Sequence, residues 1–267
     1  MSLFLDQSAS FYAVAAFAVF FVAIAKAGFG GIIGSVAMPL VAAASDTVTA
    51  VAVLYPAYLL IDLVVVWTYR RSIPWPVLRP MLAAGALGTL AATLAYGTFA
   101  PEAFAVVLGT MAVAAAIRFT LRPPGRAGEA APASGPARRG LLPLIGWCGL
   151  AGFFSFFLMG AVPAQIYLLP LRLDPRVHVA ATVAFFAAMN WSRVPIVLEL
   201  GIVTPQTLLT TALLLPVLPA GILAGRWIVA HLRKEPFFLI AQALLFLLGL
   251  YLIAGAAAHY LRPGAAG

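Results

Sequence analysis

Charged side chains are scarce in this chain of 267 residues, of which Asp, Glu, Lys and Arg together make up 9%. A soluble domain needs many more polar residues to cover its surface. Hydrophobic residues make up 64% of the chain, and the mean hydropathy is +1.05. Apolar runs long enough to cross a bilayer recur along the whole length. The composition therefore predicts an all-α, polytopic membrane protein in the lipid bilayer.

Cysteine and the common catalytic motifs are also missing. The single cysteine, Cys148, excludes an intramolecular disulfide and a metal site built from several cysteines. The sequence contains no G-x-S-x-G, no H-E-x-x-H and no phosphate-binding G-x-x-x-x-G-K. We therefore expect no enzyme activity, no catalytic residues, no metal, no cofactor and no ATP-driven pumping within this chain.

The net charge of +8 does not indicate nucleic acid as a partner. The basic residues lie mostly in short connections between apolar runs, where they set the orientation of a membrane protein. The predicted helical segments are residues 9–26, 31–44, 48–69, 76–98, 101–120, 141–158, 160–171, 176–197, 204–231 and 235–259. The second and seventh are short and follow a glycine-rich or irregular break. With each broken pair counted once, they make about eight membrane segments.

The chain divides into two similar halves. Residues 121–140 are rich in Pro, Gly, Ala and Arg and predict a cytoplasmic linker between membrane repeats at 1–120 and 141–267. "AGFGGIIGSVAMP" aligns with "AGFFSFFLMGAVP", which pairs Gly28 with Gly152 and Pro39 with Pro163. Further along, Asp62 pairs with Asn190. The halves therefore indicate an internal duplication.

The distribution of Arg and Lys favours inverted repeats. If each broken pair turns back or crosses twice, nearly all basic loop residues fall on one side of the membrane. Each repeat then crosses an odd number of times, which inverts the second repeat relative to the first. Inverted repeats with interrupted helices are a common plan of secondary transporters.

The break at "AKAGFGGIIGSVAMPL" suggests a binding site, because irregular backbone within a membrane is tolerated only where it is buried or lines a cavity. We expect the glycines to free N–H groups, and the half-helix starting near Ile32 to direct its positive end at the break. Lys26 adds a full positive charge, which predicts an anion site. Two alternatives stay open: the glycines serve helix packing, and Lys26 reaches out to the membrane interface.

Asp62 and Asn190 lie in apolar helices at matching positions of the two halves. Three interpretations of Asp62 stay open: it carries a coupling proton, it pairs with Lys26, or it pairs with an arginine. Arg193 lies three residues after Asn190 on the same helix face, where it binds an anion or caps the lipid–water boundary. Gln165, in the second broken segment, is a further candidate because a buried amide needs hydrogen-bond partners.

The sequence "GFGGIIG" followed by "MP", together with the duplicated halves and the basic linker, resembles the sulfite exporter TauE/SafE family. The resemblance extends from about residue 10 to residue 259. It implies a permease of the bacterial inner membrane for sulfite, sulfonates or related anions. Residues that match the first signature are Gly28, Gly30, Gly31, Gly34 and Pro39; Gly152 and Pro163 match the second. "FFSFFLMG" departs from the glycine-rich run expected in the second signature, which puts a symmetric site in doubt.

The sequence therefore predicts a secondary transporter for a small anion. The predicted substrate-binding residues are Lys26, Gly28, Gly30, Gly31, Ser35, Pro39, Asp62, Pro163, Gln165, Asn190 and Arg193. An anion channel and a membrane assembly factor that transports nothing are the alternatives. The coupling ion, a proton or Na⁺, and the formation of a homodimer stay open.

Overall fold

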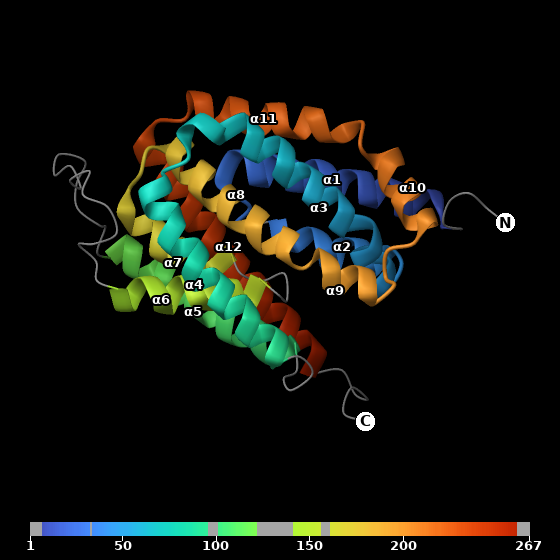
Figure 1. The fold of residues 1–267 in the computed structure, drawn as a ribbon, viewed down its shortest axis with the longest axis horizontal. Coiled ribbons are helices and arrows are strands. Elements are labelled where there is room, and N and C mark those ends of the chain that lie inside the picture. The colour runs from blue at the N-terminus through green and yellow to red at the C-terminus, as the bar shows by residue number, and fades with distance from the viewer. Residues whose placement is uncertain (1–6, 33, 96–100, 122–140, 156–160, 261–267) are drawn as a thin grey trace. The chain divides into compact units, whose positions relative to one another are not determined.

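The computed structural model of the chain describes residues 7–32, 34–95, 101–121, 141–155 and 161–260 (Figure 1). Within these residues the regular structure is entirely helical, with no strand. The all-α prediction is therefore confirmed. The predicted linker 121–140 lies outside the described residues except for Leu121, and so do residues 156–160.

Several helices are long and apolar enough to cross a membrane. Among the described residues there are 5 such spans: Ala9–Phe29, Thr47–Ser72, Trp75–Leu94, Pro175–Glu199 and Lys234–Ala258. The pair Pro205–Leu214 and Val217–His231, bent by 51°, makes a sixth if it counts as one span. A polytopic membrane protein is thus confirmed, while the layout of eight segments stays a prediction.

Helix starts follow local capping chemistry. Asp46 caps α3 (Thr47–Tyr69) by accepting hydrogen bonds from the Thr49 N–H at 2.9 Å and the Thr49 hydroxyl at 2.6 Å. These bonds favour the charged form, so they hold the pKa of the Asp46 carboxyl below its usual range. Thr204 and Thr207 form a capping box at the start of α10 (Pro205–Leu214).

Two compact units make up the structure, and each takes helices from both halves of the sequence. Unit 1 consists of Met1–Ile73 and Val179–Leu232. Its helices are α1 (Ala9–Phe29), α2 (Ala37–Ala44), α3, most of α8 (Pro175–Ser192), α9 (Val194–Glu199), α10 and α11 (Val217–His231). Unit 2 consists of Pro74–His178 and Arg233–Gly267. Its helices are α4 (Trp75–Leu94), α5 (Pro101–Leu121), α6 (Leu141–Ser155), α7 (Ala161–Leu168) and α12 (Lys234–Tyr260).

Close packing of α1 against α11 organises unit 1 (Figure 1). A Cβ atom added to Gly225 would lie 2.8 Å from the backbone nitrogen of Gly28, and one added to Gly221 would lie 2.7 Å from the carbonyl oxygen of Phe20. Only glycine allows backbones to approach so closely. Gly28 therefore lies at a helix–helix contact, as the packing alternative for the glycines expects.

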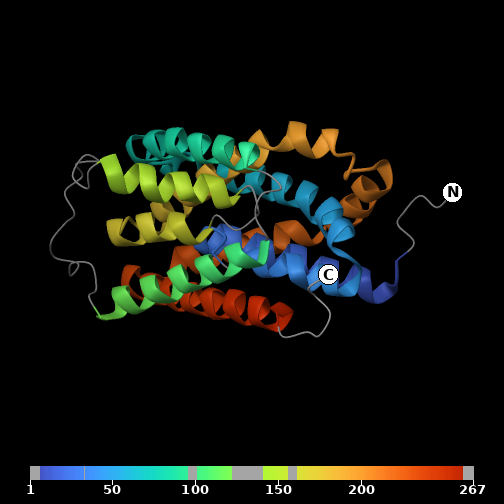
Figure 2. The same cartoon turned by 90° about the horizontal axis from the view of Figure 1, so that it is seen from below.

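Close packing at glycines also joins two helix pairs of unit 2, α4 with α6 and α5 with α12 (Figure 2). A Cβ atom on Gly152 would lie 1.9 Å from the carbonyl oxygen of Gly85. One on Gly249 would lie 2.8 Å from the carbonyl oxygen of Gly109. These contacts place the glycine of the second signature, Gly152, in a packed helix interface.

Two segments predicted as continuous helices are broken by proline. The segment 176–197 is interrupted at Arg193, where α9 begins with Pro195 in its first turn. The segment 204–231 bends by 51° between α10 and α11, at Leu215 and Pro216. Proline has no N–H to donate and its ring collides with the preceding turn, so the helix ends or kinks there.

Candidate functional site

The glycine break after α1 forms a compact cap. Gly30 adopts a left-handed conformation with φ +65°, and its N–H donates to the carbonyl of Ala25. Gly31, with φ +83°, donates its N–H to the same carbonyl at 2.8 Å. This is the pattern in which glycine closes a helix C-terminus in an αL conformation. α1 therefore continues through Phe29 and includes Lys26 in its last turn.

The hydrogen bonds of this cap contradict the expectation that backbone N–H groups supply positive charge at the break. The N–H groups of Gly30 and Gly31 are both hydrogen-bonded, so the prediction that these glycines free their N–H groups for an anion is wrong. A turn of 3-10 helix, Gly34–Val36, precedes α2, which begins at Ala37 and not near Ile32. The electrostatics of the site come from its side chains.

Lys26 forms a buried ion pair with Asp62 of α3. The Lys26 Nζ lies 2.5 Å from the Asp62 Oδ1, and the two residues are 8% and 0% exposed. The Lys26 ammonium also lies 5.0 Å from the centre of the Tyr58 ring, where a cation–π interaction is favourable. Of the three interpretations of Asp62, the structure shows the ion pair with Lys26.

Asn190 of α8 extends this pair into a network. Its Nδ2 donates to the Asp62 Oδ2 at 2.6 Å, so both carboxylate oxygens of Asp62 accept a hydrogen bond. The Asn190 Oδ1 accepts a hydrogen bond from the guanidinium of Arg193. Arg193 is 5% exposed. It is therefore a buried residue of unit 1, and its i, i+3 spacing from Asn190 lets the two side chains meet.

Two tyrosines of α3 complete the site, and the sequence reading did not single them out. The Tyr55 hydroxyl donates to the backbone carbonyl of Asn190 at 2.7 Å, and the Arg193 guanidinium lies 5.8 Å from the centre of its ring. The Tyr58 hydroxyl donates to the carbonyl of Gly34 at 3.2 Å. Tyr55, Tyr58 and Asp62 follow a helical spacing of three and four residues, which places them on one face of α3.

The network holds two cations and one anion. Asp62 is the one acidic side chain that is buried within the part of the chain that the structure describes, and it contacts Lys26 directly. Arg193 contributes the second buried positive charge, with a neutral amide oxygen as its acceptor. The described network therefore brings two cationic side chains and an amide together around one carboxylate.

Other predicted residues belong to elements that do not supply this network. Pro39 is an exposed residue of α2, and the side chain of Ser35 lies outside the described part. Pro163 and Gln165 belong to α7 in unit 2. The Gln165 Oε1 lies 2.9 Å from the Nε2 of His178, and both residues are fully buried. This amide–imidazole pair is a second polar feature, which the sequence reading found only in part.

These features define a polytopic membrane protein with a buried ionic network. The chain belongs to the sulfite exporter TauE/SafE family, whose model matches residues 15–252 and so includes the whole network. The resemblance stated from the sequence is thereby confirmed. Membership makes the chain a membrane transport protein of a family of sulfite and sulfur-anion exporters. No curated protein and no solved structure matches the chain.

Proposed function

We propose that this protein is a secondary transporter of the bacterial inner membrane that binds a small sulfur-containing or organic anion, such as sulfite or a sulfonate, at Lys26, Asn190 and Arg193. The observation that carries the proposal is the clustering of two buried cationic side chains, Lys26 and Arg193, with the amide of Asn190. Within a membrane protein, such residues mark substrate and ion pathways.

The chemistry of the donors suits an oxyanion. Lys26 offers a compact ammonium, Asn190 an amide N–H, and Arg193 a planar guanidinium that matches carboxylate-like oxygens. Asp62 now accepts from Lys26 and Asn190 through its two oxygens. An incoming anion with two or more oxygens can accept from the same donors, so substrate and Asp62 compete for them.

This competition suggests how transport is coupled. When Asp62 takes up a proton it loses its negative charge, and Lys26 is left to pair with the substrate anion. Release of the proton restores the Lys26–Asp62 pair and expels the anion. The proposed coupling ion is therefore a proton carried at Asp62, in preference to Na⁺, because the pair of Asp62 with a lysine leaves little negative charge to attract a metal cation.

A thermal-shift screen of the purified protein tests the substrate class. Sulfite, sulfate, thiosulfate, sulfoacetate, taurine and small carboxylates are compared at equal ionic strength. We expect a sulfur oxyanion or a sulfonate to raise the unfolding midpoint, because ligand bound to the native state stabilises it by mass action. Absence of any anion-specific shift would contradict the proposal, and large uncoupled currents in bilayers would indicate a channel.

A further inference from the structure

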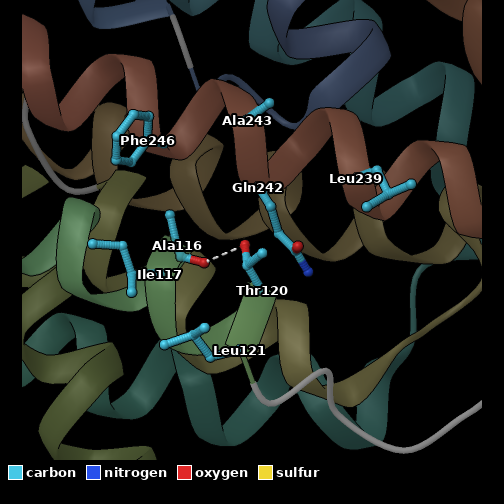
Figure 3. Close-up of a pocket in the computed structure, with 8 residues that line it drawn as sticks. All are labelled: Ala116, Ile117, Thr120, Leu121, Leu239, Gln242, Ala243 and Phe246. Carbon is cyan, nitrogen blue, oxygen red and sulfur yellow. Dashed lines mark hydrogen bonds between the residues drawn. The ribbon is translucent and has the colours of Figure 1, made fainter.

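A groove lies between α5 and α12 of unit 2, whereas the ionic network belongs to unit 1 (Figure 3). Its volume of about 440 Å³ is within the range of small-molecule sites, roughly 300–1,000 Å³. The walls are mainly aliphatic and aromatic, with Ile117 and Leu121 from α5 facing Leu239 and Phe246 from α12. Ile117, Leu121 and Leu239 are exposed, so the groove opens on the apolar surface that a bilayer covers.

One polar group is directed into this apolar groove. Gln242 of α12 is 9% exposed and lines the groove with its amide. Figure 3 shows it pointing from α12 toward Thr120 of α5. The Thr120 hydroxyl donates to the carbonyl of Ala116 at 2.9 Å, which leaves its oxygen able to accept. A ligand that is mostly apolar but carries an ester or hydroxyl group would offer this amide a hydrogen-bond partner within the apolar groove.

The groove lies at the basic end of its helix pair. Arg118 is in the last turn of α5, the turn that also carries Thr120 and Leu121, and it is exposed. Arg233 directly precedes α12, and Lys234 is the first residue of the helix, in the turn before the one that carries Leu239. Glu235 is the acidic residue at this end, so the described charges here have a positive excess.

We propose that the groove binds an anionic phospholipid, with an acyl chain between α5 and α12, an ester group at Gln242, and the phosphate near Arg118 and Lys234. The apolar walls of the groove suit the acyl chain, the Gln242 amide suits the ester, and the basic side chains suit the phosphate. Basic pockets between membrane helices favour anionic head groups, and this end of the pair is cytoplasmic in the predicted topology. A zwitterionic lipid offers the same chain and esters but no net charge.

The test compares phosphatidylglycerol with phosphatidylcholine of identical acyl chains, each titrated onto delipidated protein in detergent and counted by native mass spectrometry. We expect phosphatidylglycerol to bind more tightly. Each basic residue near an anionic lipid contributes about fivefold, so Arg118→Gln combined with Lys234→Gln should weaken binding roughly 25-fold. The matched control combines Arg70→Gln with Arg71→Gln, exposed bases of unit 1, and should keep the preference.

A second variant tests the groove itself. Ala243 lines the groove and is exposed, so Ala243→Phe fills it without disturbing the core. This variant should lose the bound lipid, while Ala257→Phe, at an exposed alanine farther along α12, should retain it. Equal binding of the two lipids, or lipid binding that survives Ala243→Phe, would overturn the proposal. So would a dimer that forms without lipid and is lost in Ala243→Phe.

Discussion

Asn190 donates a hydrogen bond through its Nδ2 to the Oδ2 of Asp62 at 2.6 Å, across 128 residues of sequence. These are the residues that the alignment of the two halves pairs with each other. Equivalent residues of a duplicated chain meet when they lie close to the axis that relates the two copies. The contact places Asp62 from one half of the sequence beside Asn190 from the other half in the buried network, as the predicted duplication expects, and of the two side chains only the Asp can carry a proton.

The Lys26–Asp62 pair should behave as one unit in stability measurements. Lys26→Met leaves a buried carboxylate without its cation, and Asp62→Asn leaves a buried ammonium without its anion. Each single change should cost about 3–5 kcal/mol, since removing one partner of a buried pair leaves an uncompensated charge. The double variant should recover most of this loss. Unfolding midpoints of the four proteins in detergent measure it, and additive losses would show that the two residues act independently.

The left-handed glycine at the end of α1 should be sensitive to its neighbour on α8. A Cβ atom on Gly30 would lie 2.8 Å from the Cβ of Thr182, whereas Gly201 has a similar φ of +62° but no atom within 4 Å. Gly201→Ala should therefore cost about 1–2 kcal/mol, from backbone strain alone. Gly30→Ala should cost a further ~1–3 kcal/mol from overpacking. Equal shifts of the unfolding midpoint would mean that Gly30 is not packed as described.

Membrane orientation gives a third prediction. Residues 70–80, the linker 121–140 and residues 231–235 should all face the cytoplasm, because this arrangement collects nearly all basic loop residues on one side. Single cysteines are introduced at Gly125 and Arg233 after Cys148 is replaced, and each is labelled from outside intact cells. Both should be protected. Labelling at 233 with protection at 125 would show that the repeats are not inverted in the predicted way.

Asp62 should be required for uphill transport driven by protons. In proteoliposomes, Asp62→Asn should still exchange labelled sulfite at equal pH on both sides, because Lys26 and Arg193 remain. It should fail to accumulate sulfite against a pH gradient. Asp62→Glu is the matched control, since it keeps an ionisable carboxyl and should retain some accumulation. If Asp62→Asn concentrates sulfite as well as the parent, the coupling site is elsewhere.

Much of the helical layout could be predicted from sequence. Apolar runs mark the helices, and the glycines and prolines between them mark the breaks. The ends of α1 and the kinks beside α9 and α11 were harder to predict from the sequence. The capping of α1 depends on Gly30 and Gly31 adopting left-handed conformations, which the sequence permits but does not dictate. A proline can end a helix or only bend it, and the packing around it decides which occurs.

The centre of the site was also partly predictable. Lys26, Asp62 and Asn190 stand out because charged and amide side chains are rare in apolar helices. Their contacts with one another depend on the tertiary structure. Only the alignment of the halves indicated that Asp62 and Asn190 would meet. Tyr55 and Tyr58 were missed because aromatic residues in an apolar helix usually indicate packing. Their spacing from Asp62 was the one available signal.

Sulfite binding to variants of Arg193 tests the central claim most directly, because Arg193 is the second buried cation of the network and a proposed substrate contact. Isothermal titration is performed on the parent, Arg193→Gln, Arg193→Lys and the control Arg70→Gln, whose exposed guanidinium lies on the Trp67 ring outside the network. Loss of a charged hydrogen bond should weaken binding about 10- to 100-fold in Arg193→Gln, with partial recovery in Arg193→Lys and no change in Arg70→Gln. Sulfite affinity equal to that of the parent in a folded Arg193→Gln protein would contradict the account.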